Sequence, residues 1–511
     1  MSSLHPRTAG ATVATCAEVA DGRVLGDTSA IVHGVTLDSR VVRSDDLYAA
    51  LPGSNAHGAS FAASAAESGA TAILTDAAGR ALVAEAGVAL PVIVVTDPRA
   101  VLGAVSAHVY RTTDLRLEMV GITGTNGKTT TAYLLTSALE ALGRRTGLIG
   151  TVETRIGTER VKSVRTTPES CDLHRLLAVM REREIDDCVM EVSSHALALH
   201  RVDGVVYDLA LFTNLSQDHL DFHPDMEDYF AAKAALFTPE RARRGLVCID
   251  DEWGARLADA AVIDCLTVGT HVAGGGQAPD FVVERGSGAG VFVLRGPDEV
   301  ELSLRSALPG AFNIMNTAMA AAALLMLGHA PDSVAAAVLT DPHVPGRMER
   351  VVVDHPDAPL ALVDYAHTPD AVAAALAALR TPEGGPLIVV LGAGGGRDVG
   401  KRTGMGRAAA SADVVIVTDD NPREEDPGAI RAAIIAGARE AGTAAAVEEV
   451  GGRRAAIERA VEIASLTGRS ATIALVGKGH ESGQEVNGVQ HPFDDRVELA
   501  EALNRRLGVT R

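Results

Sequence analysis

One ten-residue segment restricts the fold of this chain more than any other. Gly121-Ile-Thr-Gly-Thr-Asn-Gly-Lys-Thr-Thr130 follows an apolar stretch, 117–120, and precedes residues 132–142, whose apolar side chains have helical spacing. That order predicts a strand, a glycine loop and a helix. The backbone N–H groups of such a loop and the positive end of the helix dipole together bind an anion. The segment therefore predicts a nucleoside triphosphate site in an α/β fold.

The side chains after the loop fit phosphate binding. Lys128 would reach the β- and γ-phosphates, and the Thr129 hydroxyl would bind Mg²⁺. The usual phosphate-loop motif begins with a glycine and has four residues before its second glycine. This chain departs from it, because the first glycine of the motif would fall on Ile122, whereas the glycines lie at 121, 124 and 127. An ordinary glycine-rich turn is the alternative, and the strand, the Gly-Lys-Thr and the helix in this order count against it.

Length and charge exclude several classes of protein. A chain of 511 residues exceeds one hydrophobic core, so two to four domains are expected. The formal charge of −20 and the aromatic content of 3% disfavour nucleic-acid binding. The five cysteines have neither metal-ligand nor redox-motif spacing, and neither a signal peptide nor a membrane span is expected. A cytoplasmic protein, by default a monomer, is predicted.

Short apolar runs that alternate with Ala-rich helical segments divide the chain into three blocks. Residues 1–111 predict a small α/β unit, and residues 112–343 begin with the strand of the glycine loop. Within the second block, residues 271–304 predict a β-hairpin appendage, and an Ala-rich helix follows at 313–327. The prolines and glycine of residues 341–346 mark the second boundary. Residues 344–511 predict a doubly wound α/β domain.

Polar residues follow two predicted strands of the middle block. Glu191 ends one apolar run, and Asp218 and His219 come after the next. Open α/β sheets bind their ligands at the carboxyl ends of strands. A carboxylate and an imidazole near a phosphate loop therefore predict a magnesium site. A solvated loop acid is the alternative for Glu191.

Two other arrangements of nearby residues carry weaker signals. His195, His219 and His223 could form a zinc site, but their spacing is not a recognised ligand pattern. Ser194, His195 and Asp218 could form a Ser-His-acid site, but no Gly-x-Ser-x-Gly elbow surrounds the serine. Both are kept as alternatives to the magnesium site.

Two segments admit a structural and a functional interpretation. The glycines of 392–396 are followed by Arg397 at the third glycine position of a dinucleotide fingerprint, so the segment predicts a turn that presents Arg397 to an anion. Lys233 lies in an otherwise apolar helix, 229–237. Its spacing favours a surface lysine that extends its amine to water. A buried lysine with a lowered pKa and a reactive amine is the alternative.

Six strings together resemble the Mur ligases, the ATP-dependent amide-forming enzymes of peptidoglycan synthesis. They fall in family order over nearly the whole chain: Thr123-Gly-Thr-Asn-Gly-Lys-Thr-Thr130, Met190-Glu-Val-Ser-Ser-His195, Asn214-Leu-Ser-Gln-Asp-His219, Asn313-Ile-Met-Asn316, Pro345-Gly-Arg-Met-Glu349 and Val363-Asp-Tyr-Ala-His367. The resemblance implies the family's three-domain α/β architecture. A small UDP-binding domain (1–111), a central ATP-binding domain with a parallel sheet (112–343) and a C-terminal Rossmann-like domain that binds the amino acid (344–511) are expected.

Within the family, the chain is most similar to the ligases that add a diamino acid to UDP-N-acetylmuramoyl-L-alanyl-D-glutamate. The indicators are Leu37-Asp-Ser-Arg40, Thr166-Thr-Pro-Glu169 and Asp420-Asn-Pro-Arg423. The last resembles the motif associated with meso-2,6-diaminopimelate, which has a carboxylate that lysine lacks. A guanidinium binds a carboxylate through two charge-assisted hydrogen bonds. Arg423 and Arg397 are the candidates for that carboxylate, and Glu481 for the distal ammonium.

The resemblance also implies roles for the matching residues. Lys233 aligns with a lysine that CO₂ converts into a carbamate, a ligand of a second Mg²⁺, with Thr129, Glu191 and His219 as further metal ligands and Lys128 as a catalytic partner. ATP would contact Gly124, Thr125, Asn126, Gly127, Lys128, Thr129, Thr130, Asn313, Arg347, Asp364 and His367. The UDP-muramoyl dipeptide would contact Leu37, Ser39, Ser54, Asn55, Ala56, Thr166, Thr167, Ser193 and Arg201. Diaminopimelate would contact Arg397, Asp420, Asn421, Pro422, Arg423, Gly477 and Glu481. Many relatives carry a glutamine where this chain has Leu199.

The implied reaction has two steps. The D-glutamate γ-carboxylate attacks the γ-phosphate of ATP to give an acyl phosphate and ADP, and the amine of diaminopimelate then displaces phosphate. Closure of the domains on one another is expected, since the two motifs lie in different domains. The alternatives are an L-lysine-adding or a folate polyglutamate ligase of the same family, a phosphate-loop ATPase or regulatory switch, and a non-catalytic UDP-sugar-binding protein.

Overall fold

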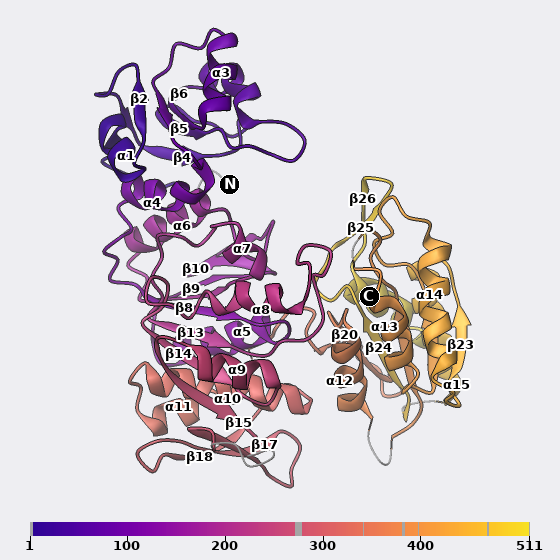
Figure 1. Ribbon diagram of the computed structural model, residues 1–511. Helices are drawn as coiled ribbons and strands as arrows, with labels where there is room; N and C mark the ends of the chain where they lie inside the picture. The colour runs from indigo at the N-terminus through magenta and orange to yellow at the C-terminus, as the bar shows by residue number, and fades with distance from the viewer. Residues whose placement is uncertain are drawn as a thin grey trace.

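Three sheets organise the chain. The computed structural model describes residues 4–270, 278–340, 342–380, 384–396, 398–467 and 470–509. The largest sheet lies in the middle block, and smaller ones lie in the N-terminal and C-terminal blocks, which confirms the α/β class. In Figure 1 the N-terminal block lies at one end of the middle block, and the C-terminal block lies beside it. In the described part of the chain, no helix is long and apolar enough to cross a membrane.

The N-terminal sheet has the strand order β2-β7-β6-β5-β4, with β2 antiparallel to β7 and the other neighbours parallel. Its core contains Leu47, Leu74 and Val105, and Cys171 and Ala178 of the middle block join it. The two blocks therefore share buried apolar surface. The elements are β1 (Ala11–Thr12), α1 (Val13–Val19), β2 (Arg23–Leu25), β3 (Ile31–Val32), β4 (Gly34–Thr36), β5 (Asp46–Ala49), η1 (Gly58–Phe61), α2 (Ala62–Glu67), β6 (Ala70–Thr75), α3 (Ala77–Glu85), β7 (Val92–Val94) and α4 (Pro98–Tyr110).

The middle sheet has eleven strands in the order β11-β10-β9-β12-β8-β13-β14-β15-β16-β17-β18. Neighbours from β9 to β16 pair in parallel, and antiparallel strands extend both edges. The strands are β8 (Glu118–Thr123), β9 (Thr146–Ile149), β10 (Glu153–Ile156), β11 (Glu159–Lys162), β12 (Asp187–Glu191), β13 (Leu209–Phe212), β14 (Arg244–Cys248), β15 (Asp264–Gly269), β16 (Phe281–Arg285), β17 (Val291–Arg295) and β18 (Glu301–Arg305). The helices are α5 (Lys128–Ala141), α6 (Ser170–Glu182), α7 (Ser194–Ala198), α8 (Met226–Ala234), α9 (Glu252–Ala260), α10 (Ala311–Met326) and α11 (Pro331–Ala337).

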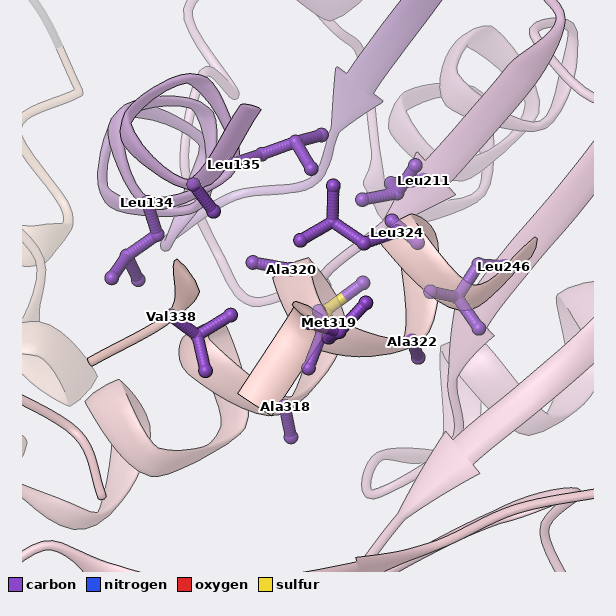
Figure 2. Close-up of a cluster of buried hydrophobic side chains, with 14 of the residues drawn as sticks. Leu134, Leu135, Leu211, Leu246, Ala318, Met319, Ala320, Ala322, Leu324 and Val338 are labelled. Carbon is purple, nitrogen blue, oxygen red and sulfur yellow. The ribbon is translucent and has the colours of Figure 1, made fainter. Parts of the chain in front are cut away.

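Helices cover both faces of this sheet because successive strand residues point to opposite sides. In β8, Val120 and Ile122 join one core and Met119 joins the other. The first core contains the Ala-rich helix α10, which packs against α5 and the strands through its alanines and through the larger Met319 and Leu324 (Figure 2). Ala320 and Leu324 of α10 are both fully buried. The Ala-rich helix expected from the sequence is therefore confirmed as the cover of the central strands.

The structure contains hairpin strands where the sequence predicts them. Strands β16, β17 and β18 form antiparallel hairpins, as the alternation predicts. They continue the main sheet, because β16 pairs with β15 through Val268 and Phe281. The predicted hairpin strands are therefore confirmed, and they extend the main sheet beyond β15. Residues 271–277 of that segment lie outside the described residues.

The C-terminal sheet has the order β19-β20-β24-β21-β22-β23, in which β19 is antiparallel to β20 and the others pair in parallel. Apolar clusters on both of its faces fit the doubly wound fold predicted for this block. The strands are β19 (Glu349–Arg350), β20 (Leu360–Asp364), β21 (Leu387–Leu391), β22 (Val414–Val417), β23 (Ala446–Glu449), β24 (Thr472–Val476), β25 (Gly483–Val486) and β26 (Val489–Pro492). The helices are α12 (Pro369–Leu379), α13 (Lys401–Ala409), α14 (Pro427–Glu440), α15 (Arg453–Thr467) and α16 (Asp495–Leu507).

Candidate active site

The glycine loop lies between β8 and α5, where the sequence predicts it. Gly124 has a φ of 139° and Gly127 a φ of 90°, conformations that side chains disfavour. A Cβ on Gly124 would clash with the hydroxyl of Thr213, and a Cβ on Gly127 would lie 2.6 Å from Asn316 Oδ1. The loop therefore needs glycine for space as well as for conformation.

The end of the neighbouring strand β13 holds the loop in shape. The side chain of Asn214 accepts a hydrogen bond from the N–H of Asn126 and donates one to its carbonyl, both at 3.0 Å. Thr213 Oγ1 donates to the same carbonyl at 2.6 Å. The carbonyl of Asn214 accepts the N–H of Thr125 at 2.8 Å. Asn214 lies in one of the family strings, but no role for it was predicted from the sequence.

Lys128 and Lys233 meet at one carbonyl oxygen. Lys128 Nζ donates to the carbonyls of Gly124 and Thr125 at 2.9 Å, and Lys233 Nζ donates to that of Gly124 at 2.8 Å. Lys233 is 1% exposed and lies over the ring of Tyr229, so the prediction from spacing that it reaches water was wrong. Tyr229 and Lys233 stand four residues apart on one buried face of α8. Burial, and then the charge of Lys128, lower the pKa of Lys233 well below its usual value.

Oxygen atoms gather around Glu191, which ends β12 and is 1% exposed. Its carboxylate accepts hydrogen bonds from the hydroxyls of Thr129 and Thr151, both at 2.9 Å, and from the N–H of Thr151 at 2.8 Å. A buried carboxylate beside a threonine hydroxyl and a phosphate loop is the donor set that suits Mg²⁺. In the described residues, no three His, Cys, Asp or Glu side chains could hold a metal by themselves. The residues thus fit an ion that also takes phosphate and water oxygens.

Asp218 joins the middle and C-terminal blocks. Its carboxylate lies 3.4 Å from His367 Nε2, 3.4 Å from Lys401 Nζ and 3.6 Å from His219 Nε2. Burial alone would raise the pKa of Asp218, but these three groups, led by His367, lower it below its ordinary range. Burial lowers the pKa of His219 to about 3. His219 is therefore a neutral imidazole, the form that binds a metal.

Of the three residues of the C-terminal block that were predicted to contact ATP, Arg347 and His367 contact side chains of the middle block. Arg347 Nη2 donates to Thr129 Oγ1 at 3.1 Å, and its guanidinium lies over the ring of Tyr365. His367 reaches Asp218, as described above. Asp364 instead accepts two backbone N–H groups of its own block, at 2.7 and 2.8 Å. Asn313 lies buried at the start of α10, where its amide donates to the carbonyl of Pro309.

The residues predicted to hold the muramoyl dipeptide lie next to Glu191. Thr167 Oγ1 donates to the carbonyl of Glu191 at 2.9 Å and accepts the N–H of Ser193 at 3.1 Å. Thr166 Oγ1 lies 3.1 Å from the hydroxyl of Thr151, which also binds Glu191. These contacts place the predicted dipeptide residues and the predicted metal residue in one network.

Three arginines surround the buried carboxylate of Glu169. Arg201 Nε lies 3.0 Å from it, Arg99 Nη1 3.2 Å and Arg165 Nη1 3.9 Å. One negative charge among three positive ones leaves a surplus that suits an anionic substrate. Arg99 also donates to the backbone carbonyl of Leu199 at 3.5 Å.

The residues predicted to hold UDP lie in the N-terminal block. Leu37 and Ser39 follow β4 and are half-buried, and Ser54, Asn55 and Ala56 are exposed after β5. These two loops follow parallel strands that pair directly. They therefore leave the same edge of the N-terminal sheet, where open α/β sheets bind ligands.

A cavity between the middle and C-terminal blocks connects Asp218 and His219 with the residues of the Asp-Asn-Pro-Arg string. It is lined by Asp218, His219, Asp221, Tyr365, His367, Gly392, Ala393, Gly394, Asp398, Lys401, Met405, Asp420, Asn421, Arg423, Gly477 and Glu481. Pro422 of the string is buried, and Arg397 lies outside the described residues.

In the part of this cavity that the C-terminal block forms, the completely buried Lys478 holds the lining side chains together. Its Nζ donates to Glu481 Oε2 at 3.1 Å and to Asn421 Oδ1 at 3.2 Å, and it lies 3.7 Å from Asp420. Asn421 also donates to Glu481 at 2.9 Å. Two carboxylates and one ammonium leave a net negative charge, which suits the ammonium of an amino acid. No role for Lys478 was predicted from the sequence.

Ser194 has different partners from those considered in the sequence. His223 is 1% exposed, and its Nε2 lies 3.0 Å from Ser194 Oγ while its Nδ1 lies 2.6 Å from Asp228 Oδ2. The Ser194–His195–Asp218 site is therefore not formed, because His223 takes the serine hydroxyl. His223 also engages both ring nitrogens, which counts against the zinc alternative. The three groups instead connect the start of α7 to α8, the helix of Lys233.

Comparisons with known proteins agree with this geometry. Family models match residues 31–110 (Mur ligase family, catalytic domain), 122–324 (Mur ligase middle domain) and 346–479 (Mur ligase, glutamate ligase domain). A UDP-N-acetylmuramoyl-L-alanyl-D-glutamate--2,6-diaminopimelate ligase of Streptomyces avermitilis is 49% identical over 98% of this chain and 99% of its own. The protein of that name from Corynebacterium glutamicum is 48% identical over 93% and 92%.

Solved structures resemble nearly all or a large part of the chain. A UDP-N-acetylmuramoyl-L-alanyl-D-glutamate--2,6-diaminopimelate ligase has a TM-score of 0.65 and 29% identity, with 97% of this chain and 99% of that one covered. A Mycobacterium tuberculosis folylpolyglutamate synthase complexed with ADP and AMPPCP has a TM-score of 0.57 and 20% identity, with 79% and 94% covered. The second likeness concerns the fold alone.

Proposed function

Because the chain belongs to the Mur ligase family, we propose that it joins meso-2,6-diaminopimelate to the D-glutamate γ-carboxylate of UDP-N-acetylmuramoyl-L-alanyl-D-glutamate in an ATP-dependent reaction. Relatives of nearly full length that carry this ligase name support the proposal. The structural observation that carries it is the shared cavity. Asp218 and His219 of the middle block and Arg423 and Glu481 of the C-terminal block line it together.

The phosphate loop serves the first step. The γ-carboxylate attacks the γ-phosphorus, the bond to the β-phosphate oxygen breaks, and ADP leaves. Lys128 and the loop N–H groups stabilise charge on the transferring phosphate oxygens, and Arg347, at Thr129, adds a second positive charge. Lys128 and Lys233 now share the Gly124 carbonyl, so Lys128 can leave it for phosphate while Lys233 keeps the contact.

The buried groups near the loop fit Mg²⁺ and a modified lysine. Thr129, Glu191 and His219 would hold the metal, which when bound neutralises phosphate charge. Burial lowers the pKa of Lys233, which favours the neutral amine, the form that adds to CO₂. Carbamylation would convert a buried group of low proton affinity into an anionic metal ligand. Two Mg²⁺ ions, ATP and CO₂ complete the proposed requirements.

The second step takes place where the cavity joins the two blocks. One amine of diaminopimelate attacks the carbonyl carbon of the acyl phosphate, and inorganic phosphate leaves as the amide forms. The net negative group of Asp420, Glu481 and Lys478 would hold the distal ammonium, and Arg423 the distal carboxylate. With its distal ammonium and carboxylate held there, diaminopimelate has its attacking amine directed away from these groups, along the cavity.

We also propose the domain limits 1–111, 112–343 and 344–511, closure of the last domain on the others, a monomeric state and a cytoplasmic location. The interdomain contacts of Asp218 and Arg347 support closure, because they bring the two blocks together at the phosphate loop. Small-angle scattering that does not change when nucleotide and muramoyl substrate are added would contradict the closure.

The decisive experiment measures ADP release with Mg²⁺, the muramoyl dipeptide, and either meso-diaminopimelate or L-lysine. Release that depends on diaminopimelate, with the tripeptide product found by mass spectrometry, is the expected result. Preference for lysine would retain the ligase and refute the assignment of Arg423. Hydrolysis that needs neither amino acid would favour a phosphate-loop ATPase. A Lys128→Met variant should release no ADP, which controls for contaminating ATPases.

A further inference from the structure

One ion pair beside the cavity has no part in the proposed reaction. Arg423 lines the cavity, whereas Glu485 is not among the described residues that line it. Glu485 Oε2 nevertheless lies 3.3 Å from Arg423 Nε. On another side of the guanidinium, Nη1 donates to the carbonyl of Gly395 at 2.6 Å. The carboxylate of Glu485 therefore contacts the guanidinium of a cavity-lining arginine from a residue that does not itself line the cavity.

Backbone hydrogen bonds hold Glu485 in this position. The N–H of Arg423 donates to the carbonyl of Glu485 at 3.1 Å, and the N–H of Asn487 donates to the carbonyl of Arg423 at 2.7 Å. The N–H of Glu485 donates to the side chain of Asn421 at 3.0 Å. Strand β25 is thus fastened along the Asp-Asn-Pro-Arg string. The pairing of the two side chains follows from this register and does not depend on a long, freely moving loop.

Another acid in the same segment is already engaged. Glu425 forms a two-point ion pair with the buried Arg402, at 2.6 and 2.7 Å, and also accepts the N–H of Gly396. Asp420 and Glu481 face Lys478. Of these described acids, Glu485 is the one whose charge is directed at Arg423.

We propose that Glu485 sets how strongly the site distinguishes diaminopimelate from lysine, acting through Arg423 as a positioning residue. The inference rests on the proposed function. When lysine binds, the guanidinium has no carboxylate from the substrate, and a charge left without a partner is costly. Glu485 supplies an internal partner and so reduces the penalty for lysine. It also cancels part of the positive field that attracts the distal carboxylate of diaminopimelate.

Removal of the Glu485 charge should therefore increase selectivity. The Glu485→Gln variant keeps the length of the side chain and an oxygen that accepts from Arg423 Nε, but it removes the negative charge. The ratio of kcat/KM for diaminopimelate to that for lysine should rise by up to about fivefold, the range for a partly exposed ion pair. The side chains of Arg423 and Glu485 are 27% and 33% exposed, which keeps the effect in this range.

Two further variants make the experiment specific. Glu424→Gln removes the same charge one residue from Arg423, at an exposed side chain without an ion pair among the described residues, and should leave the ratio unchanged. Glu485→Asp keeps the charge and should remain close to the original protein. In Glu485→Gln, KM for diaminopimelate should fall while kcat and the KM for ATP stay constant. A merely structural defect would raise KM, and calorimetric titration with diaminopimelate would show weaker binding.

The possible outcomes separate this inference from the proposed function. A rise in KM for diaminopimelate, or an unchanged ratio in Glu485→Gln, would overturn the inference while the ligase assignment stands. A ratio that rises equally in Glu424→Gln would also overturn it, because any nearby charge would then suffice. An original protein that uses neither amino acid would refute the proposed function itself.

Discussion

The pair of Arg453 and Asp495 should be the most sensitive point in the stability of the C-terminal block. Both side chains are 0% exposed, and Arg453 Nε and Nη2 donate to the two carboxylate oxygens at 2.7 and 2.6 Å. Nη2 also donates to the carbonyl of Val476 at 3.0 Å, the last residue of β24. The pair therefore joins α15 and α16 to the strand end that precedes Gly477 of the cavity.

Arg453→Met removes one charge and leaves Asp495 buried without its partner. Breaking such a pair costs about 3–5 kcal/mol. For a block of this size, each kcal/mol lowers Tm by about 2–4 °C, so the C-terminal transition should fall by about 6–20 °C. The double variant Arg453→Met/Asp495→Leu should recover most of the loss, because both charges are then absent.

Scanning calorimetry on the full chain measures this prediction. Arg454 and Glu498 form an ion pair one residue along the same helix from Arg453, but Arg454 is 62% exposed. Glu498→Gln should therefore cost about 1 kcal/mol or less and serves as the matched control. The reasoning would be refuted if Arg453→Met matched that control, or if the double variant were as unstable as the single one.

Three further predictions concern buried groups. Lys233→Met should reduce kcat by at least about 100-fold, the loss typical for one group that stabilises developing charge, and removal of CO₂ should inhibit only the original protein in an ADP-release assay. The pKa of His174 is lowered by burial to about 4, below the unfolded value of 6.5, so its contribution is present above pH 6.5 and is lost as pH falls toward 4. Urea unfolding should show about 2 kcal/mol lost through His174 between pH 7 and pH 5, and His174→Gln should remove that part. His223→Gln should raise the Mg²⁺ concentration for half-maximal activity, because the link between Ser194 and Asp228 holds α8; unchanged Mg²⁺ dependence would contradict this role.

Local sequence patterns predicted much of the fold. The apolar stretch before Gly121 became β8, and the helical spacing after Lys128 became α5, because neighbouring residues determine both. The strings that resemble the family then predicted the residues around the phosphate loop. The expected Rossmann-like block was also recognisable, since its buried strands are continuous runs of branched side chains.

Contacts between segments that are distant in the sequence could not be predicted from local patterns. Lys401 and Asp218 are 183 residues apart in the chain, and periodicity says nothing about their meeting. The burial of Lys233 could not be predicted from local sequence either. A single lysine in an apolar helix can lie at the surface or in the interior, and here the packing of α8 on the phosphate loop buries it. The pairing of Ser194 with His223 depended likewise on how the start of α7 packs against the loop that precedes α8.

The shared core of the first two blocks determines how the chain can be divided for separate expression. Cys171 and Ala178 are part of the hydrophobic core of the N-terminal block. A fragment that ends near residue 111 would lack these residues and would expose the apolar side chains that they cover. One apolar cluster of the C-terminal block consists only of residues within 351–503. The other cluster also packs against Phe312 of the middle block. A cut near residue 343 therefore exposes less apolar surface. Exchanging amino-acid-binding blocks between relatives should accordingly succeed at that junction, with the first two blocks transferred as one piece.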